Sequence, residues 1–231
     1  MNLAIDIGNT ATKWATYEEY EQTACGHGMP EAGLMKAADA VLACASGEAP
    51  KGVELLRSNS LLPIQLDYKT PNTLGADRIA AACGAWQRHK GEACLVIDAG
   101  TCITVDFIDG TGVYHGGAIM PGLAMSINAL HEKTARLPLI SLEGVERAPV
   151  LGRSTEESIL AGTLGATMLA LAGYAALYRE KSPVMHVLLT GGDAAQLVAA
   201  GASGWEHIPT LTLDGLNAIM QYRKEHQREQ R

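Results

Sequence analysis

The sequence predicts an α/β protein built from two similar halves, and two features of the chain support this. Segments typical of strands alternate with segments typical of helices, which is the pattern of α/β architecture. In addition, residues 3–12 recur as residues 95–104 at a constant offset of 92. The positions that are identical at this offset are Leu3, Ile5, Asp6, Gly8 and Thr12. A repeat of this kind indicates an internal duplication, so we expect halves at 1–91 and 92–231.

The first half opens on an expected hairpin, since Leu3 and Ile5 alternate with other residues and Gly8 and Asn9 form a turn. A later helix is expected because Ile79, Ala82, Cys83 and Trp86 recur at helical spacing. The expected elements are a hairpin over 3–13, a third strand within 16–28, helices over 33–42, 53–60 and 77–90, and strands over 41–45 and 62–66.

The second half repeats the hairpin and then continues with more helix. Ser154 and Glu157 have the spacing of a capping box, which predicts the start of a long uncharged helix over 158–178. The other expected elements are strands over 103–108, from 113 and over 184–189, a flexible connection over 116–122, and helices over 124–134 and 216–231, the last of them polar and charged.

Composition narrows the class of protein. The 231 residues are 47% hydrophobic, which is typical of a globular chain with a sizeable core. The formal net charge of −7 does not favour a nucleic-acid partner. Five cysteines, an odd number without CxxC spacing, indicate neither a disulfide framework nor a zinc site. A reducing compartment fits best, and we expect a cytoplasmic location.

The uncharged stretch at 158–178 raises the alternative of a membrane span, because it is long enough to cross a bilayer. It is rich in Ala and Gly and contains Thr163 and Thr167, so its hydropathy is weak. A buried helix, with small residues that allow close contact in a core or between subunits, is the preferred interpretation. We therefore expect no membrane partner.

The first hairpin carries groups suited to a nucleotide triphosphate. Asp6 at the end of the strand suits a magnesium ion, and Lys13 suits a phosphate. A Gly turn lets backbone N–H groups approach an anion. An ordinary hairpin with a half-buried acid remains the alternative. Val105 stands where the second hairpin would need a lysine, so the two halves are not chemically equivalent, and Lys13 is the expected phosphate contact.

A second candidate lies at residues 75–78, where Asp77 and Arg78 follow a glycine at the start of an expected helix. Asp77 could accept a proton from an attacking hydroxyl, and Arg78 could hold a carboxylate or phosphate by paired bonds. Helix capping by Asp77, with Arg78 in solvent, is the alternative. The chain has no GxxxxGK[ST] or GxGxxG motif, which excludes P-loop and Rossmann sites.

Several motifs together resemble the type III pantothenate kinase family. They run in order from residue 3 to about 193 and so cover most of the chain. The motifs are DIGNT at 6–10 with Lys13, Tyr68 before Pro71, GADR at 75–78, DAGT at 98–101, GGAIMPG at 116–122, TARLP at 134–138, GRST at 152–155 and TGG at 190–192. One departure is Cys102, where alanine is the more usual residue of the family.

The resemblance implies two duplicated ribonuclease-H-like domains of the actin-like ATPase superfold, with an ATP cleft between them. It also implies ATP-dependent phosphorylation of pantothenate, the first step of coenzyme A synthesis, in a homodimer. Asp77 would be the general base, Asp98 would bind potassium or ammonium, and Asp6 would bind magnesium. The implied ATP-binding residues are Asp6, Ile7, Gly8, Asn9, Thr10, Ala11, Thr12, Lys13 and Thr101. The implied pantothenate-binding residues are Tyr68, Gly75, Ala76, Asp77, Arg78 and Thr155, the last of them across the dimer interface.

Two other functions compete with this one. A non-catalytic transcriptional accessory protein of the same fold should lose Asp77, Arg78 or Lys13, and all three are present. A different kinase or a phosphatase of the same superfold is disfavoured by the adjacent Asp77 and Arg78 and by the short chain.

Overall fold

The computed structural model describes residues 1–45 and 52–230 and divides into two compact units. The first unit contains residues 1–94, 106–116 and 210–231, and the second contains 95–105 and 117–209. The chain therefore passes from one unit to the other several times. The units differ from the expected halves 1–91 and 92–231, because residues 106–116 and the C-terminal helix belong to the first unit.

The first unit contains a five-stranded sheet with the order β3-β2-β1-β4-β5. Strand β1 pairs antiparallel with β2 and parallel with β4, and β2 continues antiparallel to β3. The strands are β1 (Asn2–Ile7), β2 (Thr12–Glu18), β3 (Glu21–His27), β4 (Ala40–Ala45) and β5 (Glu54–Leu55), and the short helix α1 (Ala32–Ala37) connects β3 to β4. Leu3, Ile5 and Ala43 are fully buried and form the core on the helix α1 side, which fixes the face of β1 that points inward.

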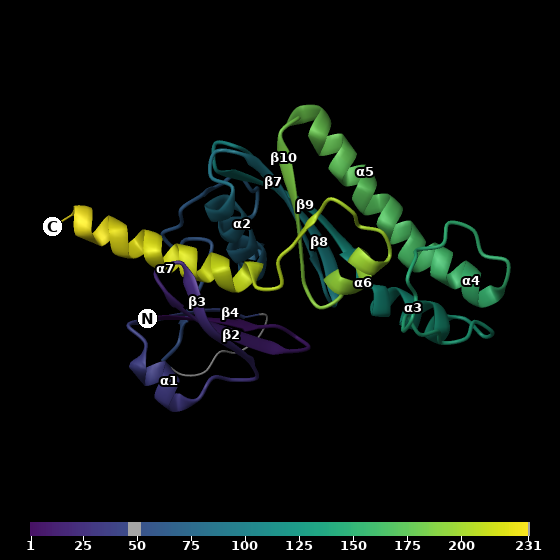
Figure 1. Ribbon diagram of the computed structural model, residues 1–231, viewed down its shortest axis with the longest axis horizontal. Coiled ribbons are helices and arrows are strands. Elements are labelled where there is room, and N and C mark those ends of the chain that lie inside the picture. The colour runs from purple at the N-terminus through teal and green to yellow at the C-terminus, as the bar shows by residue number, and fades with distance from the viewer. Residues whose placement is uncertain (46–51, 231) are drawn as a thin grey trace. The chain divides into compact units, whose positions relative to one another are not determined.

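Two helices of the first unit, α2 (Ala76–Arg88) and α7 (Leu211–Glu229), pack closely on each other and on β4 (Figure 1). Gly84 and Gly215 permit this approach, since a Cβ on either would collide with backbone of the facing helix. Asn217 on α7 accepts a hydrogen bond from Asn2 at 2.9 Å and donates one to the Glu19 carbonyl at 2.8 Å. These buried polar contacts fix α7 against the sheet.

A second sheet has six strands in the order β11-β10-β7-β8-β9-β6. Its strands are β6 (Gln65–Leu66), β7 (Ala93–Ala99), β8 (Cys102–Ile108), β9 (Val113–Pro121), β10 (Met185–Thr190) and β11 (Glu206–His207). β6 runs parallel to β9 within the first unit, and β10 runs parallel to β11 within the second. The 3-10 turn η1 (Pro71–Thr73) leads from β6 into α2.

The helices of the second unit are α3 (Leu123–Lys133), α4 (Thr155–Leu160), α5 (Ala166–Lys181) and α6 (Ala194–Ala199). A π-helical segment η2 (Ala161–Gly165) joins α4 to α5, so that one helix runs over Thr155–Lys181. Gly165 lies where a Cβ would collide with the Pro149 carbonyl. Among the described residues this is the one helix long and apolar enough to cross a membrane, and 39% of its most apolar stretch is buried. Its length and composition are weak evidence for a membrane span, because core helices of soluble proteins have the same properties.

Most of the expected elements are confirmed, including the hairpins, the helix α2 and the Ser154 side-chain cap of α4. The expected capping box is only partly formed, because the Glu157 carboxylate accepts from the Arg153 N–H and not from that of Ser154. The helix expected over 53–60 is wrong, because that segment forms only the two-residue strand β5. The connection expected over 116–122 is also wrong, since β9 continues to Pro121. The helix expected over 158–178 is present, but it is not buried on all sides as expected. Leu171 and Ala175 are buried, whereas Leu169 and Leu177 are 62% and 59% exposed.

The C-terminal helix differs from its prediction in position and character. It begins at Leu211, and its first half is buried, although the sequence suggested a polar helix over 216–231. The charged residues that dominate the composition lie in its last turns, where the helix leaves the core.

We predict that Asp109 stabilises the β8–β9 turn in a pH-dependent way. Burial alone would raise the pKa of Asp109, but hydrogen bonds from His115, Thr111 and Val113 outweigh it and hold the pKa well below its usual range. Its contribution is therefore present above the unfolded-state pKa of about 4 and is lost as pH falls through the lower folded-state pKa. Asp109→Ala should lower the free energy of unfolding by about 2 kcal/mol at pH 7 and by less at pH 3.5, measured by urea denaturation.

Asp67→Ala is the control, because the Asp67 carboxylate is 77% exposed and lies 3.4 Å from the same histidine. It should change the stability little at either pH. An equal loss for Asp109→Ala at both pH values would contradict the assigned cause.

Candidate functional site in the first unit

The first hairpin presents an exposed turn flanked by an acid and a lysine. In the register of β1 and β2, Asp6 lies opposite Lys13, and both side chains are partly buried. The turn is closed by a hydrogen bond from the Gly8 N–H to the Ala11 carbonyl at 3.0 Å. Residues 8–11 are all exposed, so an anion can reach this turn from solvent. The geometry suits phosphate, for which a turn backbone and a nearby cation are common partners.

Asp6 is held by its neighbour on β4. The Cys44 thiol donates a hydrogen bond to Asp6 Oδ1 at 3.2 Å. Burial raises the pKa of Cys44, which keeps this group a neutral donor. Burial also raises the pKa of Asp6, and the negative charge of Asp77 raises it further, so the two carboxylates lie near each other. The Asp6 carboxylate offers oxygen atoms of the kind that a magnesium ion prefers.

Asp77 stands at the start of α2, one residue after its first helical residue. Its Oδ1 accepts a hydrogen bond from the Arg78 N–H at 2.9 Å. The N-cap residue of α2 is Gly75 and no side chain caps this helix, so the alternative of helix capping by Asp77 is wrong. Asp77 is exposed, and its other oxygen, Oδ2, is not used in that bond. Gly75 has no positive φ, yet a Cβ there would collide with Asp77 Oδ1. The glycine is therefore needed for the position of the Asp77 carboxylate.

Arg78 is buried, in contrast to the alternative that placed it in solvent. Its Nε donates to Asp106 Oδ1 and Oδ2 at 3.0 and 3.2 Å, and its Nη2 donates to Oδ1 at 2.6 Å. Burial would lower the pKa of Arg78, but the hydrogen bonds and charge of Asp106 outweigh it and raise the pKa. The sequence suggested that Arg78 makes paired hydrogen bonds to a substrate anion. Along its Nε–Nη2 edge, Arg78 instead makes these bonds to the Asp106 carboxylate.

Two tyrosines complete the surroundings of Arg78. The Tyr114 hydroxyl donates to Asp106 Oδ1 at 2.6 Å, and the Tyr68 ring lies 6.0 Å from Arg78 Cζ. Gly116 has φ of +87°, and a Cβ there would lie 3.0 Å from the Tyr68 ring, so this glycine makes room for the ring. The structure therefore brings Tyr68 and Arg78 together, as expected for two residues of one site.

Sequence reasoning missed Asp106 and Tyr114. A signal for Asp106 was available, because it is a lone acid inside the strand 103–108, whose other residues are apolar or Thr. An acid buried in such a strand needs a cationic partner. Nothing local in the sequence identified Arg78 as that partner, since 28 residues separate them.

The second unit holds the other expected residues, Asp98 and Thr101. Here the Gly100 N–H bonds to the Cys102 carbonyl at 2.9 Å, so the turn is tighter than the one at Gly8. Gly191 has φ of +97°, and a Cβ there would collide with the Ala99 carbonyl and Asp98 Oδ1. The Asp193 N–H also bonds to the Ala99 carbonyl, at 2.8 Å. The turn at residues 190–193 therefore lies against Asp98, with carboxylate and carbonyl oxygens that suit a potassium ion.

Thr155 lies at the exposed first residue of α4, in the second unit. The Glu157 N–H donates to Ser154 Oγ at 3.1 Å, and Glu157 Oε2 accepts from the Arg153 N–H at 2.6 Å. Thr155 lines a cavity of about 800 Å³ in this unit. The other lining residues are Leu130, Leu137, Gly152, Arg153, Ser154, Ser158, Ile159 and Gly162.

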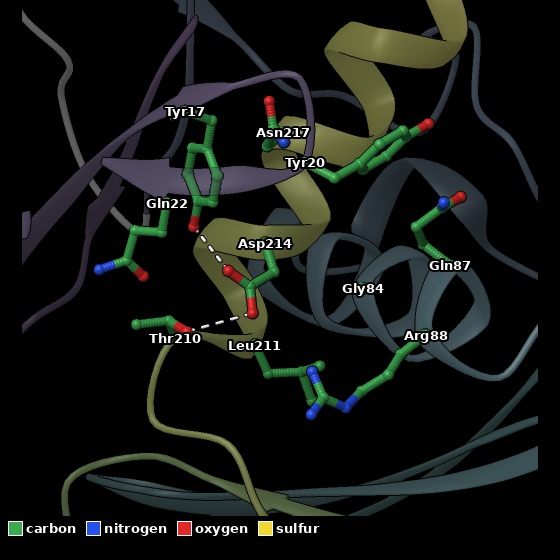
Figure 2. A pocket seen from close by; sticks show the side chains of 10 residues that line it. All are labelled: Tyr17, Tyr20, Gln22, Gly84, Gln87, Arg88, Thr210, Leu211, Asp214 and Asn217. Carbon is green, nitrogen blue, oxygen red and sulfur yellow. Dashed lines mark hydrogen bonds between the residues drawn. The ribbon is translucent and has the colours of Figure 1, made fainter. Parts of the chain in front are cut away.

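The first unit contains a cavity of about 380 Å³, and some of the side chains that line it form hydrogen bonds with one another (Figure 2). Asp214 accepts from the Tyr17 hydroxyl at 2.6 Å and from Thr210 Oγ1 at 3.1 Å. These contacts anchor the start of α7 on β2, and we assign no ligand to this cavity.

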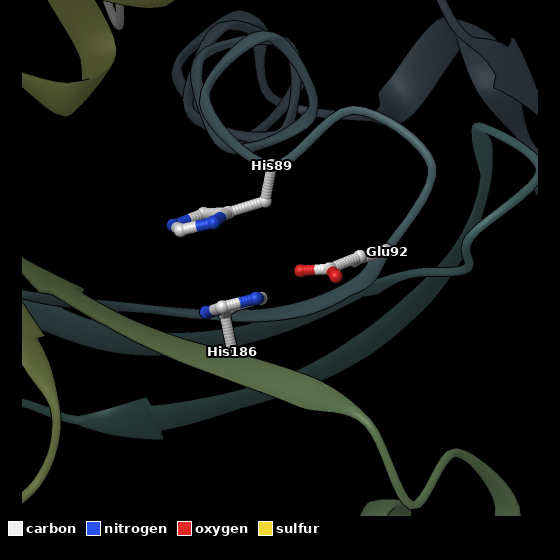
Figure 3. A group of neighbouring side chains, drawn as sticks. All are labelled: His89, Glu92 and His186. Atoms are coloured by element: carbon white, nitrogen blue, oxygen red, sulfur yellow. The ribbon is translucent and has the colours of Figure 1, made fainter.

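We assign no ligand role to His89, His115, His131 or His186. His89 is the C-cap residue of α2, and its carbonyl accepts from the Glu92 N–H at 3.0 Å. Figure 3 shows the side chains of His89 and Glu92 of the first unit. His186, drawn with them, lies on β10 and belongs to the other unit, so we assign no metal to this group. His115 bonds to Asp109, and His131 bonds to the Leu137 carbonyl at 2.9 Å.

Comparison with known proteins identifies relatives over nearly the whole chain. The sequence model of the type III pantothenate kinase family matches residues 34–176. A type III pantothenate kinase of Bacteroides fragilis is 38% identical over 241 residues, covering 96% of this chain and 98% of its own length. One of Phocaeicola vulgatus is 36% identical over 240 residues, with the same coverage of both chains.

Solved structures share the fold at low sequence identity. A Baf family transcriptional activator from Campylobacter jejuni gives a TM-score of 0.66 at 19% identity, covering 96% of this chain and 99% of its own. The activator of 2-hydroxyisocaproyl-CoA dehydratase from Clostridium difficile, with bound ADPNP, gives 0.57 at 17% identity, covering 99% and 97%. These likenesses confirm the expected α/β fold, and they show the fold alone.

We predict that removing Asp106 strongly destabilises the first unit. Asp106→Ala leaves the Arg78 guanidinium buried without its carboxylate, and an uncompensated buried charge costs about 3–5 kcal/mol. Urea denaturation should report a loss of that size in the free energy of unfolding.

Glu54→Ala is the matched control, because Glu54 pairs with Arg223 at 2.7 Å while the Glu54 side chain is 62% exposed. Its loss should cost at most about 1 kcal/mol. Similar losses for the two variants would mean that burial of the Arg78 pair does not matter.

Proposed function

Since the chain belongs to the type III pantothenate kinase family, we propose that it transfers the γ-phosphoryl group of ATP to the primary hydroxyl of pantothenate. The products are 4'-phosphopantothenate and ADP, and the reaction opens coenzyme A synthesis. One observation carries the proposal: an exposed carboxylate, Asp77, lies near Asp6 at the mouth of a turn suited to phosphate. An acceptor hydroxyl bound beside Asp77 would meet a phosphoryl group held at that turn.

Asp77 is the proposed general base. Its Oδ1 is fixed by the Arg78 N–H, so we assign acceptance of the hydroxyl proton to Oδ2. Proton transfer to a positioned carboxylate during attack is ordinary general base catalysis. The loose transition state of phosphoryl transfer needs positioning and neutralised charge more than covalent help, and Gly75 supplies part of that positioning.

The first hairpin is the proposed phosphate site. Its contribution is a set of exposed N–H groups and hydroxyls, with the Lys13 ammonium behind them on β2. The assigned residues are Asp6, Ile7, Gly8, Asn9, Thr10, Ala11, Thr12 and Lys13. Thr101 keeps the phosphate-contacting role that the family resemblance implies. Lys13 would offset charge on the transferring group, which the second hairpin cannot do with Val105.

Two metal sites belong to the proposal. Asp6 would hold magnesium, and Asp98 would hold potassium or ammonium, with oxygen atoms near each that fit these ions. When bound, the cations supply charge neutralisation for the phosphates. The protein's own part is to keep Asp6 oriented through Cys44 and to keep Asp98 against the turn at Gly191.

Pantothenate is proposed to contact Tyr68, Thr155 and residues 75–78. A homodimer that brings Thr155 to a partner's substrate, and a cytoplasmic location, complete the proposal. All five cysteines are free, which agrees with a reducing compartment. The likeness to a transcriptional activator concerns the fold, and Lys13, Asp77 and Arg78 support an enzyme.

We predict that ATP consumption by the purified chain depends on pantothenate. ADP release should be measured with magnesium, with and without pantothenate, in potassium and then in sodium buffer. Turnover should require pantothenate and be faster in potassium. Absence of pantothenate-dependent turnover in potassium buffer would reject the proposed reaction, and pantothenate-independent ADP release would favour another ATPase.

We predict that Asp77→Asn lowers kcat by about 10²–10⁴-fold, because an amide cannot accept the hydroxyl proton. Glu31→Gln is the control, since Glu31 is an exposed acid at the start of a different helix, α1, in the same unit. It should leave kcat unchanged. Near-normal turnover in Asp77→Asn would exclude Asp77 as the base.

A further inference from the structure

We propose that Asp106 and Tyr114 are positioning residues that hold the Arg78 guanidinium in the orientation needed to bind the pantothenate carboxylate. The inference rests on the proposed function, because Arg78 is assigned there to the substrate. It concerns two residues outside the motifs that carry the family resemblance.

The first step is the geometry at Asp106. Its Oδ1 accepts from Arg78 Nε at 3.0 Å, from Arg78 Nη2 at 2.6 Å and from the Tyr114 hydroxyl at 2.6 Å. Its Oδ2 accepts from Arg78 Nε at 3.2 Å. Asp106 is 2% exposed and Tyr114 is fully buried, so water does not compete for these bonds. The carboxylate is fixed on one side by arginine and on another by tyrosine.

The second step follows from the shape of the guanidinium. The group is planar, and its Nε–Nη2 edge is used by Asp106. A second carboxylate can therefore be bound only through the Nη1–Nη2 end of the plane. The direction of that end is set by Asp106, and the Tyr68 side chain, whose ring centroid lies 6.0 Å from Cζ, also hydrogen-bonds to Arg78.

The third step concerns charge. A buried ion pair has little net charge to attract another anion, so a substrate carboxylate must rely on well-directed hydrogen bonds. The Tyr114 hydroxyl also stabilises the negative charge on Asp106, which leaves more of the positive charge of Arg78 for the substrate. Loss of the hydroxyl would weaken both the orientation and the available charge. Both changes would weaken binding of the substrate carboxylate by Arg78.

The test uses Tyr114→Phe, because Asp106→Ala is expected to destabilise the unit. The variant removes one oxygen and keeps the ring. Tyr17→Phe is the matched control: Tyr17 is 2% exposed and donates to Asp214 at the same distance, 2.6 Å, elsewhere in the first unit. Steady-state kinetics with pantothenate and with ATP, and urea denaturation, are measured for both variants and the unchanged chain.

Tyr114→Phe should raise KM for pantothenate about fivefold, the effect expected for one hydrogen bond of ordinary strength, with kcat and KM for ATP unchanged within about twofold. Tyr17→Phe should leave all three constants unchanged while losing similar stability. Equal constants for the two variants would overturn the positioning role, and so would a fall in kcat without a rise in KM for pantothenate. No pantothenate-dependent turnover in the unchanged chain would instead overturn the proposed function and this inference with it.

Discussion

The first unit depends on pairing the buried charge of Arg78. The first turn of α2 carries this guanidinium into the interior, where an isolated charge is strongly unfavourable. The compensating carboxylate, Asp106, comes from β8, 28 residues further along the chain. The unit therefore cannot be completed by residues 1–94 alone, which explains why it also includes 106–116. Tyr114, which donates to that carboxylate, and the turn at Asp109 lie in the same added segment.

The same helix separates two neighbouring residues with opposite roles. Successive residues on an α-helix point about 100° apart, so Asp77 and Arg78 cannot face the same way. Asp77 is exposed, whereas Arg78 is buried against Asp106. Asp77 is thus open to a substrate hydroxyl, while Arg78 can reach the substrate only with the part of its guanidinium that Asp106 leaves. The buried pair fixes the helix start from which Asp77 extends.

Much of the fold followed from local patterns, and the errors have identifiable causes. The repeat of Leu, Ile, Asp, Gly and Thr predicted both hairpins because strand period and turn chemistry are local properties. The helix expected over 53–60 is wrong because its three apolar residues, Val53, Leu55 and Leu56, are too few to distinguish a helix from a strand. Glycines suggested a flexible connection at 116–122, but there they make room for Tyr68 and for backbone at Gly122. The Arg78–Asp106 pair is a long-range contact, and a single sequence contains no local pattern that joins its two partners.

The two hairpins show how a duplicated motif can acquire different chemistry. Both place an acid at the end of a strand before a glycine, yet the surroundings differ within each unit. Asp6 lies opposite Lys13, accepts a bond from the Cys44 thiol and feels the charge of Asp77. Asp98 precedes a tighter turn and contacts the loop at Gly191, where backbone carbonyl oxygen is close. A small divalent ion prefers carboxylates, whereas a larger monovalent ion also binds carbonyl oxygens, so the two hairpins differ in the direction that the proposed magnesium and potassium sites require.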